Sequence, residues 1–474
     1  MTLNLNSLLT AQNPNLLARL ALVRGVTEDD GLGFHWSVYK ATHRFSNPLG
    51  MEFGEDSFKN SFQDYLSGLT DLIKSISMHG YISDLALHPI RVNRRGIIID
   101  GAHRIAVLIH LGFDELDIEL SNDEFLSNPD LTQLERNGMP RVFCEALEVQ
   151  LLDVAAEASA LVFFGFERKK VTRLLEITQP QGVNVIKRVD LDLNGNSKAR
   201  LIEMCYGAND WFTPELGQQM TVERFLGQKE MATVLFLGHS SDFATSLKKK
   251  LRISIGGFER RIHGTDNDHD LSRLMTFFTG TGRHWANSAP PGAEQRLTND
   301  IRELRSHQDI SKLTKNYPLI SGSTVLELYG TYQARDRDII MPGWKTGKSE
   351  LSDTSHVRHL ESFGVDIDHL ATNPEMYFFF LGTKVLSLRG GAEIYLSHAA
   401  SDSGKNKIRL LLQALVNSTL TDSPSQQRSL IVPKARVLAS RAYESLVAIL
   451  PRKWRSPARR IARQLGSALF NTKR

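Results

Sequence analysis

The chain has 474 residues, a formal net charge of +4 and two cysteines, Cys144 and Cys205. This length is too great for one ordinary core and predicts two or three domains. Two cysteines exclude a disulfide framework, and residues 1–25 lack the pattern of a signal peptide, so we expect a globular protein of the reducing cytoplasm.

The first predicted domain follows an N-terminal extension, residues 1–50. Apolar residues recur at intervals of three and four from Ser57 to Gly80, which predicts an amphipathic helix. The segments LALHPIRV and GIIID then predict two short strands joined by a turn at residues 93–96. The second strand runs directly into a predicted helix, in the segment IIIDGAHRIAVLIHLG.

The junction between this strand and this helix predicts a phosphate-binding turn. Gly101 can adopt the backbone angles that a tight reversal needs, and a helix start presents N–H groups and a positive dipole end. His103 and Arg104 stand at that start. A guanidinium is a permanently charged phosphate donor, and an imidazole can add a donor or transfer a proton. The alternative is that Arg104 only pairs with Asp100.

The order of these elements resembles the ParB/sulfiredoxin-like domain, in which a D-G-x-H-R turn holds nucleotide phosphates. The resemblance covers residues 51–125 and rests on the helix, the segment ISDLALHPIRV, the hairpin and IIIDGAHRIAVLIHLGF. It implies an α+β fold that binds a nucleoside triphosphate, ATP or CTP, through Asp100, Gly101, His103 and Arg104.

The ParB/sulfiredoxin-like fold occurs in sulfiredoxins, in DNA-partitioning proteins and in ATP- or ADP-dependent kinases. The reactive cysteine of sulfiredoxins is replaced by Ala102, and the helix-turn-helix of DNA-partitioning proteins is not found after the domain. The kinase-like use remains, and the analogy implies a general base at Glu55 or Asp56. The alternative role for either acid is to cap the following helix.

Residues 126–230 form an α+β segment to which the sequence assigns no role. Within it, VNVIKRVDLDLNGNSKARLIEMCYG predicts a hairpin around Asn194 and Gly195. A new domain, residues 231–417, is predicted to begin with the apolar run ATVLFLG and a helix through the basic cluster at residues 248–252. In RRIHGTDNDHDLSRL the polar residues favour a helix cap over a metal site.

A second candidate site lies in the segment SGSTVLELYGTYQARDRDIIMPG. Gly322 and Ser323 open a predicted helix, and Asp336 and Asp338 enter a predicted strand. Alternate residues of a strand share a face, so the two carboxylates can hold Mg²⁺. The alternative is that both acids pair with Arg335 and Arg337.

This segment resembles the signature of DNA polymerase beta-type nucleotidyltransferases, a Gly-Gly/Ser pair followed by Asp-x-Asp on a strand of a mixed sheet. The resemblance implies phosphates on Gly322 and Ser323, Mg²⁺ on Asp336 and Asp338, and a third carboxylate from a later strand. The alternation in FGVDIDHLATNP suggests Asp368 or Asp366 for that carboxylate, and the aromatic run MYFFFLGTKVLSL predicts core.

Several C-terminal segments, among them LELYGTYQARDRDII, are similar to poorly characterised proteins of bacterial surface-polysaccharide clusters. A linker is predicted at residues 418–433 and a basic amphipathic tail at 434–474. The tail has eleven Lys or Arg residues and one acid, giving +10, so the rest of the +4 chain carries −6. This disfavours nucleic acid as a partner and suggests peripheral contact with an anionic membrane, docking on a protein surface being the alternative.

The sequence therefore predicts an α/β protein with two phosphate-handling domains. We expect a Mg²⁺-dependent nucleotidyltransferase or small-molecule kinase acting on a hydroxyl or sugar-phosphate acceptor. Two alternatives stay open: a ParB-like, nucleotide-gated DNA-binding regulator, and a catalytically inactive scaffold. The sequence names neither the acceptor nor the oligomeric state.

Overall fold

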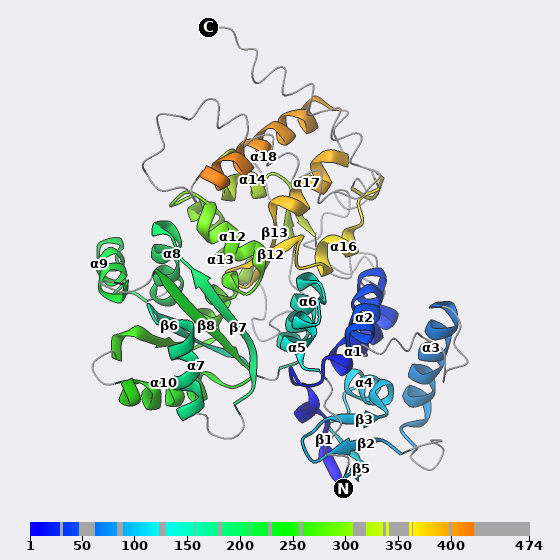
Figure 1. Ribbon diagram of the computed structural model, residues 1–474. Helices are drawn as coiled ribbons and strands as arrows, with labels where there is room; N and C mark the ends of the chain where they lie inside the picture. Colours follow the sequence, from blue (N-terminus) through cyan, green and yellow to red (C-terminus); the bar gives the residue numbers. More distant parts are fainter. Residues whose placement is uncertain are drawn as a thin grey trace. The chain divides into compact units, whose positions relative to one another are not determined.

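The computed structural model describes residues 1–28, 32–46, 62–82, 89–122, 129–155, 157–178, 183–207, 209–225, 230–255, 259–306, 319–334, 338–340, 360–362, 364–397 and 401–420 (Figure 1). The chain is a mixture of helices and small sheets, as predicted. It divides into two compact units. Unit 1 comprises Met1–Ala158, Pro180–Arg188 and Leu235–Ser240, and unit 2 comprises Ser159–Gln179, Val189–Val234 and Ser241–Arg474.

Unit 1 begins with a short strand and ends with a pair of helices. Its elements are β1 (Thr2–Asn4), a 3₁₀ turn (Leu5–Leu8), α1 (Pro14–Glu28), α2 (Leu32–Ser46), α3 (Phe62–His79), β2 (Arg91–Asn93), β3 (Ile98–Asp100), α4 (Ala102–His110), β4 (Glu115–Asp117), β5 (Glu119–Ser121), α5 (Leu131–Arg136) and α6 (Arg141–Val154). The predicted helix, hairpin and second helix of residues 57–112 are confirmed where the chain is described, as α3, β2–β3 and α4.

Two small sheets organise this unit. Strand β2 lies between β3, which is antiparallel to it, and β5, which is parallel. Strand β1 pairs with β4, so the first residues of the chain join a strand more than a hundred residues later. The stretch expected as an extension, residues 1–50, is therefore part of the same compact unit as residues 51–125.

Helix α1 forms the centre of unit 1. Its sequence, PNLLARLALVRGVTE, is apolar on nearly every side, which is typical of a helix that is covered all round. It packs against α2, α4 and α6, and Leu17, Leu20 and Leu22 are fully buried. The apolar face of α4 meets it through Ile105 and Leu108, which are also fully buried.

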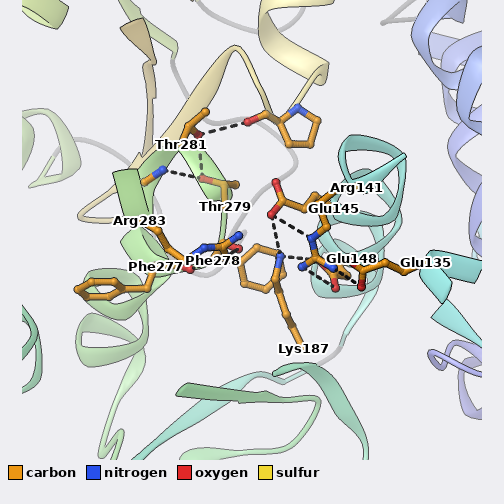
Figure 2. Close-up of polar contacts among 12 residues, drawn as sticks. Glu135, Arg141, Glu145, Glu148, Lys187, Phe277, Phe278, Thr279, Thr281 and Arg283 are labelled. Atoms are coloured by element: carbon orange, nitrogen blue, oxygen red, sulfur yellow. Dashed lines mark hydrogen bonds and ion pairs between the residues drawn. The ribbon is translucent and has the colours of Figure 1, made fainter. Parts of the chain in front are cut away.

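A buried group of charged side chains joins α6 to the first residues of strand β7 (Val185–Asp192), all within unit 1 (Figure 2). The side chain of Lys187 is fully buried, and its Nζ lies 2.5 Å from Glu148 and 3.5 Å from Glu145. Arg141 contacts both acids and also Glu135. The two buried carboxylates therefore each have two cationic partners.

Unit 2 contains the remaining elements. They are β6 (Ser159–Phe164), α7 (Arg168–Thr178), the second half of β7, α8 (Gly195–Tyr206), α9 (Pro214–Phe225), β8 (Met231–Leu237) up to Val234, α10 (Ser241–Ile255), β9 (Ile262–Gly264), α11 (Asp268–Leu274), α12 (Gly280–Ser288), α13 (Gln295–Ser306), β10 (Leu319–Ser321), α14 (Thr324–Leu328), β11 (Asp338–Ile340), α16 (Ile367–Thr372), β12 (Tyr377–Phe380), β13 (Thr383–Leu386), α17 (Leu388–Ser397) and α18 (Asp402–Leu420). Residues 418–420, expected in the linker, belong to α18.

The first sheet of unit 2 has the strand order β7-β8-β6-β9. Figure 1 shows α7 and α10 together on one side of it and α8 on the other. Strand β8 lies between β7 and β6, so a domain boundary between residues 230 and 231 would run through this sheet. The division between the compact units also passes through β7 and β8.

The hairpin predicted around Asn194 and Gly195 is wrong. Strand β7 is followed there by helix α8, because Asn194 caps the helix: its side chain accepts from the Ser197 N–H, and the Ser197 hydroxyl accepts from the Asn194 N–H. This reciprocal capping box satisfies two N–H groups that a helix start would otherwise leave unpaired.

The second sheet is mixed, with the order β11-β10-β13-β12. Strand β10 is antiparallel to β11 and parallel to β13, and β12 and β13 form a hairpin. Phe378, Phe379 and Phe380 are buried, as predicted for the aromatic run. The hydroxyl of Thr281 joins helix α12 to β12, because it donates to the carbonyl of Tyr377. Arg283 of the same helix donates to the carbonyls of Phe277 and Phe278 (Figure 2).

None of the helices in the described ranges has the length and hydropathy needed to cross a lipid bilayer. Both cysteines are buried and free, and burial raises the pKa of the Cys144 thiol to about 12.

The cap of α8 gives a stability test. Asn194→Ala removes the bond from the Ser197 N–H to the Asn194 side chain and the bond from Asn194 Nδ2 to the carbonyl of Asn287, so we expect it to lower the free energy of unfolding of unit 2 by about 1 to 2 kcal/mol. Gly195→Ala, the matched control, meets no atom within 4 Å and should be neutral or stabilising. Equilibrium denaturation measures both, and equal losses would contradict the assignment.

Candidate functional site

A polar cavity of about 340 Å³ opens in unit 1 where helices α1 and α4 begin. It is lined by Asn13, Asn15, Leu16, Arg19, Ile98, Ile99, Asp100, Gly101, Ala102, His103 and Arg104. All four residues of the predicted phosphate-binding turn therefore line one cavity, together with residues from the start of α1. Two helix starts facing one cavity supply N–H groups and positive dipole ends from two directions.

Gly101 makes the turn between β3 and α4 possible. Its φ is 90°, a left-handed conformation that glycine adopts without strain, and it occupies the N-cap position of α4. A side chain here would also collide with Ile90, whose Cγ1 would lie 2.7 Å from an added Cβ. Asp100 stabilises the turn, because its Oδ1 accepts from the Gly101 N–H at 2.7 Å.

Arg104 lies at the edge of the cavity with two long polar contacts. Its Nη2 is 3.5 Å from Asp100 Oδ2, and its Nη1 donates to the Tyr81 hydroxyl at 3.4 Å. The ion pair with Asp100 that the sequence allowed is therefore present, and it coexists with the cavity. Since the Asp100 side chain is 47% exposed, this pair contributes little to stability.

His103 is held on both ring nitrogens. Arg19 Nε donates to His103 Nδ1 at 3.4 Å, so Nδ1 acts as the acceptor. We therefore assign the proton of a neutral His103 ring to Nε2, which then donates to the Tyr65 hydroxyl. The Tyr65 pKa lies above its ordinary value, mainly through burial and then through the neighbouring Tyr39. This arrangement suits an imidazole that positions Arg19 better than one that transfers a proton.

Arg19 is the charged residue of the cavity that was not predicted from the sequence. Its guanidinium lies 5.3 Å from the centroid of the Tyr39 ring and also donates to the Asn15 carbonyl. The one available signal was the segment NPNLLARL, since proline is favoured at the first helical position and places Asn13 as the cap and Arg19 one turn further. Nothing local in the sequence linked this helix to the turn at Gly101.

In unit 2 the structure brings Gly322 and Asp338 together. Strands β10 and β11 pair so that Ser321 lies opposite Asp338. Gly322 has φ 68°, and a Cβ added to it would lie on the Asp338 carboxylate. The absence of a side chain on Gly322 therefore leaves room for the Asp338 carboxylate beside the turn.

Two buried hydroxyl groups accompany this turn. Tyr395 of α17 donates to the Gly322 carbonyl at 2.6 Å, and its pKa is raised by burial and by the nearby charge of Asp338. Ser323 is 7% exposed and occupies the N-cap position of α14 without a side-chain capping bond. Asp336, the second expected metal ligand, lies outside the described residues, as do Arg335 and Arg337.

The strand predicted for Asp366 and Asp368 is wrong. Asp366 is the N-cap of α16, because its side chain accepts from the His369 N–H at 2.9 Å, and Asp368 lies in the first turn of that helix. Within the described ranges no group of three or more His, Cys, Asp or Glu side chains is placed to hold a metal ion. Glu55 and the basic tail lie outside these ranges.

The segment RRIHGTDNDHDLSRL contains a helix cap, as predicted. Asn267 caps α11 by accepting from the Asp270 N–H. His263 of β9 is 6% exposed, and its pKa is lowered to about 3 by burial and then by the charge of Lys248. Lys248 also donates to Asp266 at 3.0 Å.

Comparisons of the chain with protein-family models, with curated proteins and with solved structures found no match.

The turn at Gly101 is testable with two glycines of the same helix. Gly101→Ala combines left-handed backbone strain with the clash on Ile90, so we expect a loss of about 2 to 3 kcal/mol in the free energy of unfolding of unit 1. Gly112→Ala, at φ 84° with no atom within 4 Å, should lose only about 1 kcal/mol. Denaturation curves that show equal losses would rule out the close contact.

His263 predicts a pH dependence of stability. Because the folded pKa of about 3 lies below the ordinary 6.5, the unfolded chain binds the proton first, and stability is lost as pH falls from 6.5 towards 3. Relative to His263→Gln, the wild type should lose about 2 kcal/mol of unfolding free energy between about pH 7 and about pH 5. Parallel pH profiles for the two proteins would contradict a neutral buried imidazole.

Proposed function

We propose that unit 1 binds the phosphates of a nucleoside triphosphate, ATP or CTP, in the cavity at the starts of α1 and α4. The observation that carries this proposal is the convergence of Arg19, His103 and Arg104 with two helix starts on one polar cavity. Guanidinium groups and helix N-termini are the two commonest phosphate receptors in proteins. The resemblance to the ParB/sulfiredoxin-like domain agrees with this assignment.

The residues of the cavity have separate roles in this proposal. Arg104 and the first turn of α4 bind phosphate oxygens, and Gly101 lets the ligand approach the backbone closely. Arg19 supplies the second cation, and His103 and Tyr65 fix its position through the hydrogen bonds described above. Arg104 exchanges its long contact with Asp100 for a phosphate oxygen, while Asp100 keeps its bond from the Gly101 N–H.

We further propose that the bound nucleotide is used for phosphoryl or nucleotidyl transfer to a small hydroxyl or sugar-phosphate acceptor, with surface-polysaccharide synthesis as the biological setting. Asp338 beside Gly322 supports this for unit 2. A Mg²⁺ ion there would be held by Asp338 together with Asp336 and would neutralise phosphate charge. Of this pair, the structure describes only Asp338, whose carboxylate fits against the bare Gly322 backbone.

The cytoplasmic location and the contact of the tail with an anionic membrane stay predictions from the sequence. They are compatible with two free cysteines in the described part of the chain.

Binding is tested by isothermal titration of ATP, CTP, GTP and UTP with and without Mg²⁺. Arg104→Gln should weaken the preferred nucleotide about tenfold or more, because a charge-assisted hydrogen bond is lost. Arg94→Gln, an exposed arginine of the β2–β3 turn, is the control and should change affinity less than about twofold. Equal weakening by the two variants, or no nucleotide binding by the wild type, would refute the assignment.

Transfer is tested separately from binding. Asp338→Asn keeps the size of the side chain but removes its charge, so we expect loss of nucleotide turnover with sugar phosphates as acceptors and unchanged affinity in the unit 1 cavity. Radiolabelled nucleotide follows turnover. Asp368→Asn is the matched control, since Asp368 lies half-buried in the first turn of α16 and not beside Gly322. Activity that survives Asp338→Asn would exclude Asp338 from the chemistry.

A further inference from the structure

Helix α10 and strand β9 of unit 2 hold two basic side chains along the edge of the first sheet. Lys248 and Arg252 are one helical turn apart on α10, so they lie on the same face. Arg252 Nη2 donates to the Ile262 carbonyl at 2.7 Å, and Lys248 Nζ donates to Asp266 at 3.0 Å. Both charges are thereby fixed beside His263, which lies between Ile262 and Gly264 on β9.

A third cation, Arg224 of helix α9, lies near His263, and Tyr206 of helix α8 is next to both. The His263 ring packs edge-on against the Tyr206 ring, with centroids 4.7 Å apart, and the Arg224 guanidinium lies 5.9 Å from the same Tyr206 centroid. Arg224 is only 8% exposed. The charges of Lys248, Arg252 and Arg224 all act to lower the His263 pKa, so three cations surround one buried imidazole.

The charges of this cluster do not balance. Its one carboxylate, Asp266, is already taken by Lys248 and by the Thr245 hydroxyl. Neither Arg224 nor Arg252 forms an ion pair with any carboxylate in the part of the chain that the structure describes. Asp270 and Arg273 of α11 carry opposite charges and act on each other electrostatically.

Three nitrogen atoms of the cluster are also unsatisfied. His263 Nε2, Arg224 Nε and Arg252 Nε are buried and find no hydrogen-bond partner in the described ranges. Buried polar groups are normally paired, and an unpaired donor loses its hydration without compensation. Lys187 Nζ of unit 1 also makes no hydrogen bond within the described ranges, but two glutamates lie within 3.5 Å of it and balance its charge.

We propose that Arg224, Arg252 and His263 form a phosphate-binding site in unit 2, separate from the cavity of unit 1, for a small phosphate ester. The two guanidinium groups neutralise the phosphate charge, and His263 donates from Nε2 to a phosphate oxygen. Trp211, which is 52% exposed and has its ring 5.9 Å from that of Tyr206, offers an aromatic face to the organic part of the ester. The ligand supplies the anion and the acceptors that the folded chain lacks.

The test uses inorganic phosphate as the probe and the His263 ring as the reporter. The full chain carrying Arg104→Gln, which disables the unit 1 cavity, is titrated with phosphate against chloride at equal ionic strength. The NMR signal of His263 is assigned by its loss in His263→Gln. We expect a saturable shift of that signal with phosphate, and a dissociation constant of about 1 mM or tighter.

Variants of two arginines distinguish a binding site of defined geometry from attraction by general positive charge. Arg224→Gln should weaken the binding of phosphate about tenfold or more. Arg224→Lys keeps the charge but loses the planar set of N–H donors of the guanidinium, so it should weaken binding less. Arg260→Gln is the matched control, because Arg260 is exposed and its guanidinium lies 3.8 Å from Glu223, and it should leave the affinity within about twofold. An immobile His263 signal, or equal effects of Arg224→Lys and Arg260→Gln, would overturn the proposal.

Discussion

A cation that is removed from water needs an anion or a set of carbonyl oxygens in its place, and this requirement explains most of the buried polar structure of the chain. Lys187 meets it with Glu145 and Glu148. Arg200 meets it with the carbonyls of Ala286, Ala289 and Pro290 and with Glu294, while its guanidinium lies 4.7 Å from the centroid of the Trp285 ring. We have proposed that a ligand with negative charge meets the same requirement around His263 and in the cavity of unit 1.

The cavity of unit 1 depends on an apolar contact as much as on its charges. Helix α1 is surrounded by other helices, and its packing against α4 brings two helix starts to the same place. Gly101 contributes by lying against Ile90, so the turn cannot move away from the sheet without opening the core. The phosphate-binding geometry proposed for this cavity is thus supported by the hydrophobic interior of the unit. Arg19 and His103 then couple the two helices through a direct hydrogen bond.

Local features were predictable from the sequence, and features that depend on distant residues were not. The turn at Gly101 could be predicted because strand, glycine and helix are consecutive. Arg19 could not, since it meets His103 across 84 residues. Asn194-Gly195 has the composition of a hairpin turn, but Ser197 completes a capping box, so the chain forms a helix there. Asp366 likewise caps a helix where alternation alone predicted a strand. The predicted motif named Gly322 and Asp338 but not the contact between them, which the pairing of β10 with β11 produces. The convergence of Arg224 on His263 likewise leaves no local signal in the sequence.

Strands β7 and β8 each contribute residues to both compact units, and this limits how the protein can be divided into fragments. A shortened protein that stops after Ala158 would keep Glu145 and Glu148 but would lose Lys187, leaving two interior acids opposite Arg141 alone. The same cut would leave all four strands of the β7-β8-β6-β9 sheet with the C-terminal fragment, but Pro180–Arg188 and Leu235–Ser240 would lose the rest of the unit to which they belong. Neither half made by such a cut would be a faithful copy of its counterpart in the whole chain. The functions of the two units are therefore better separated by point substitution than by truncation.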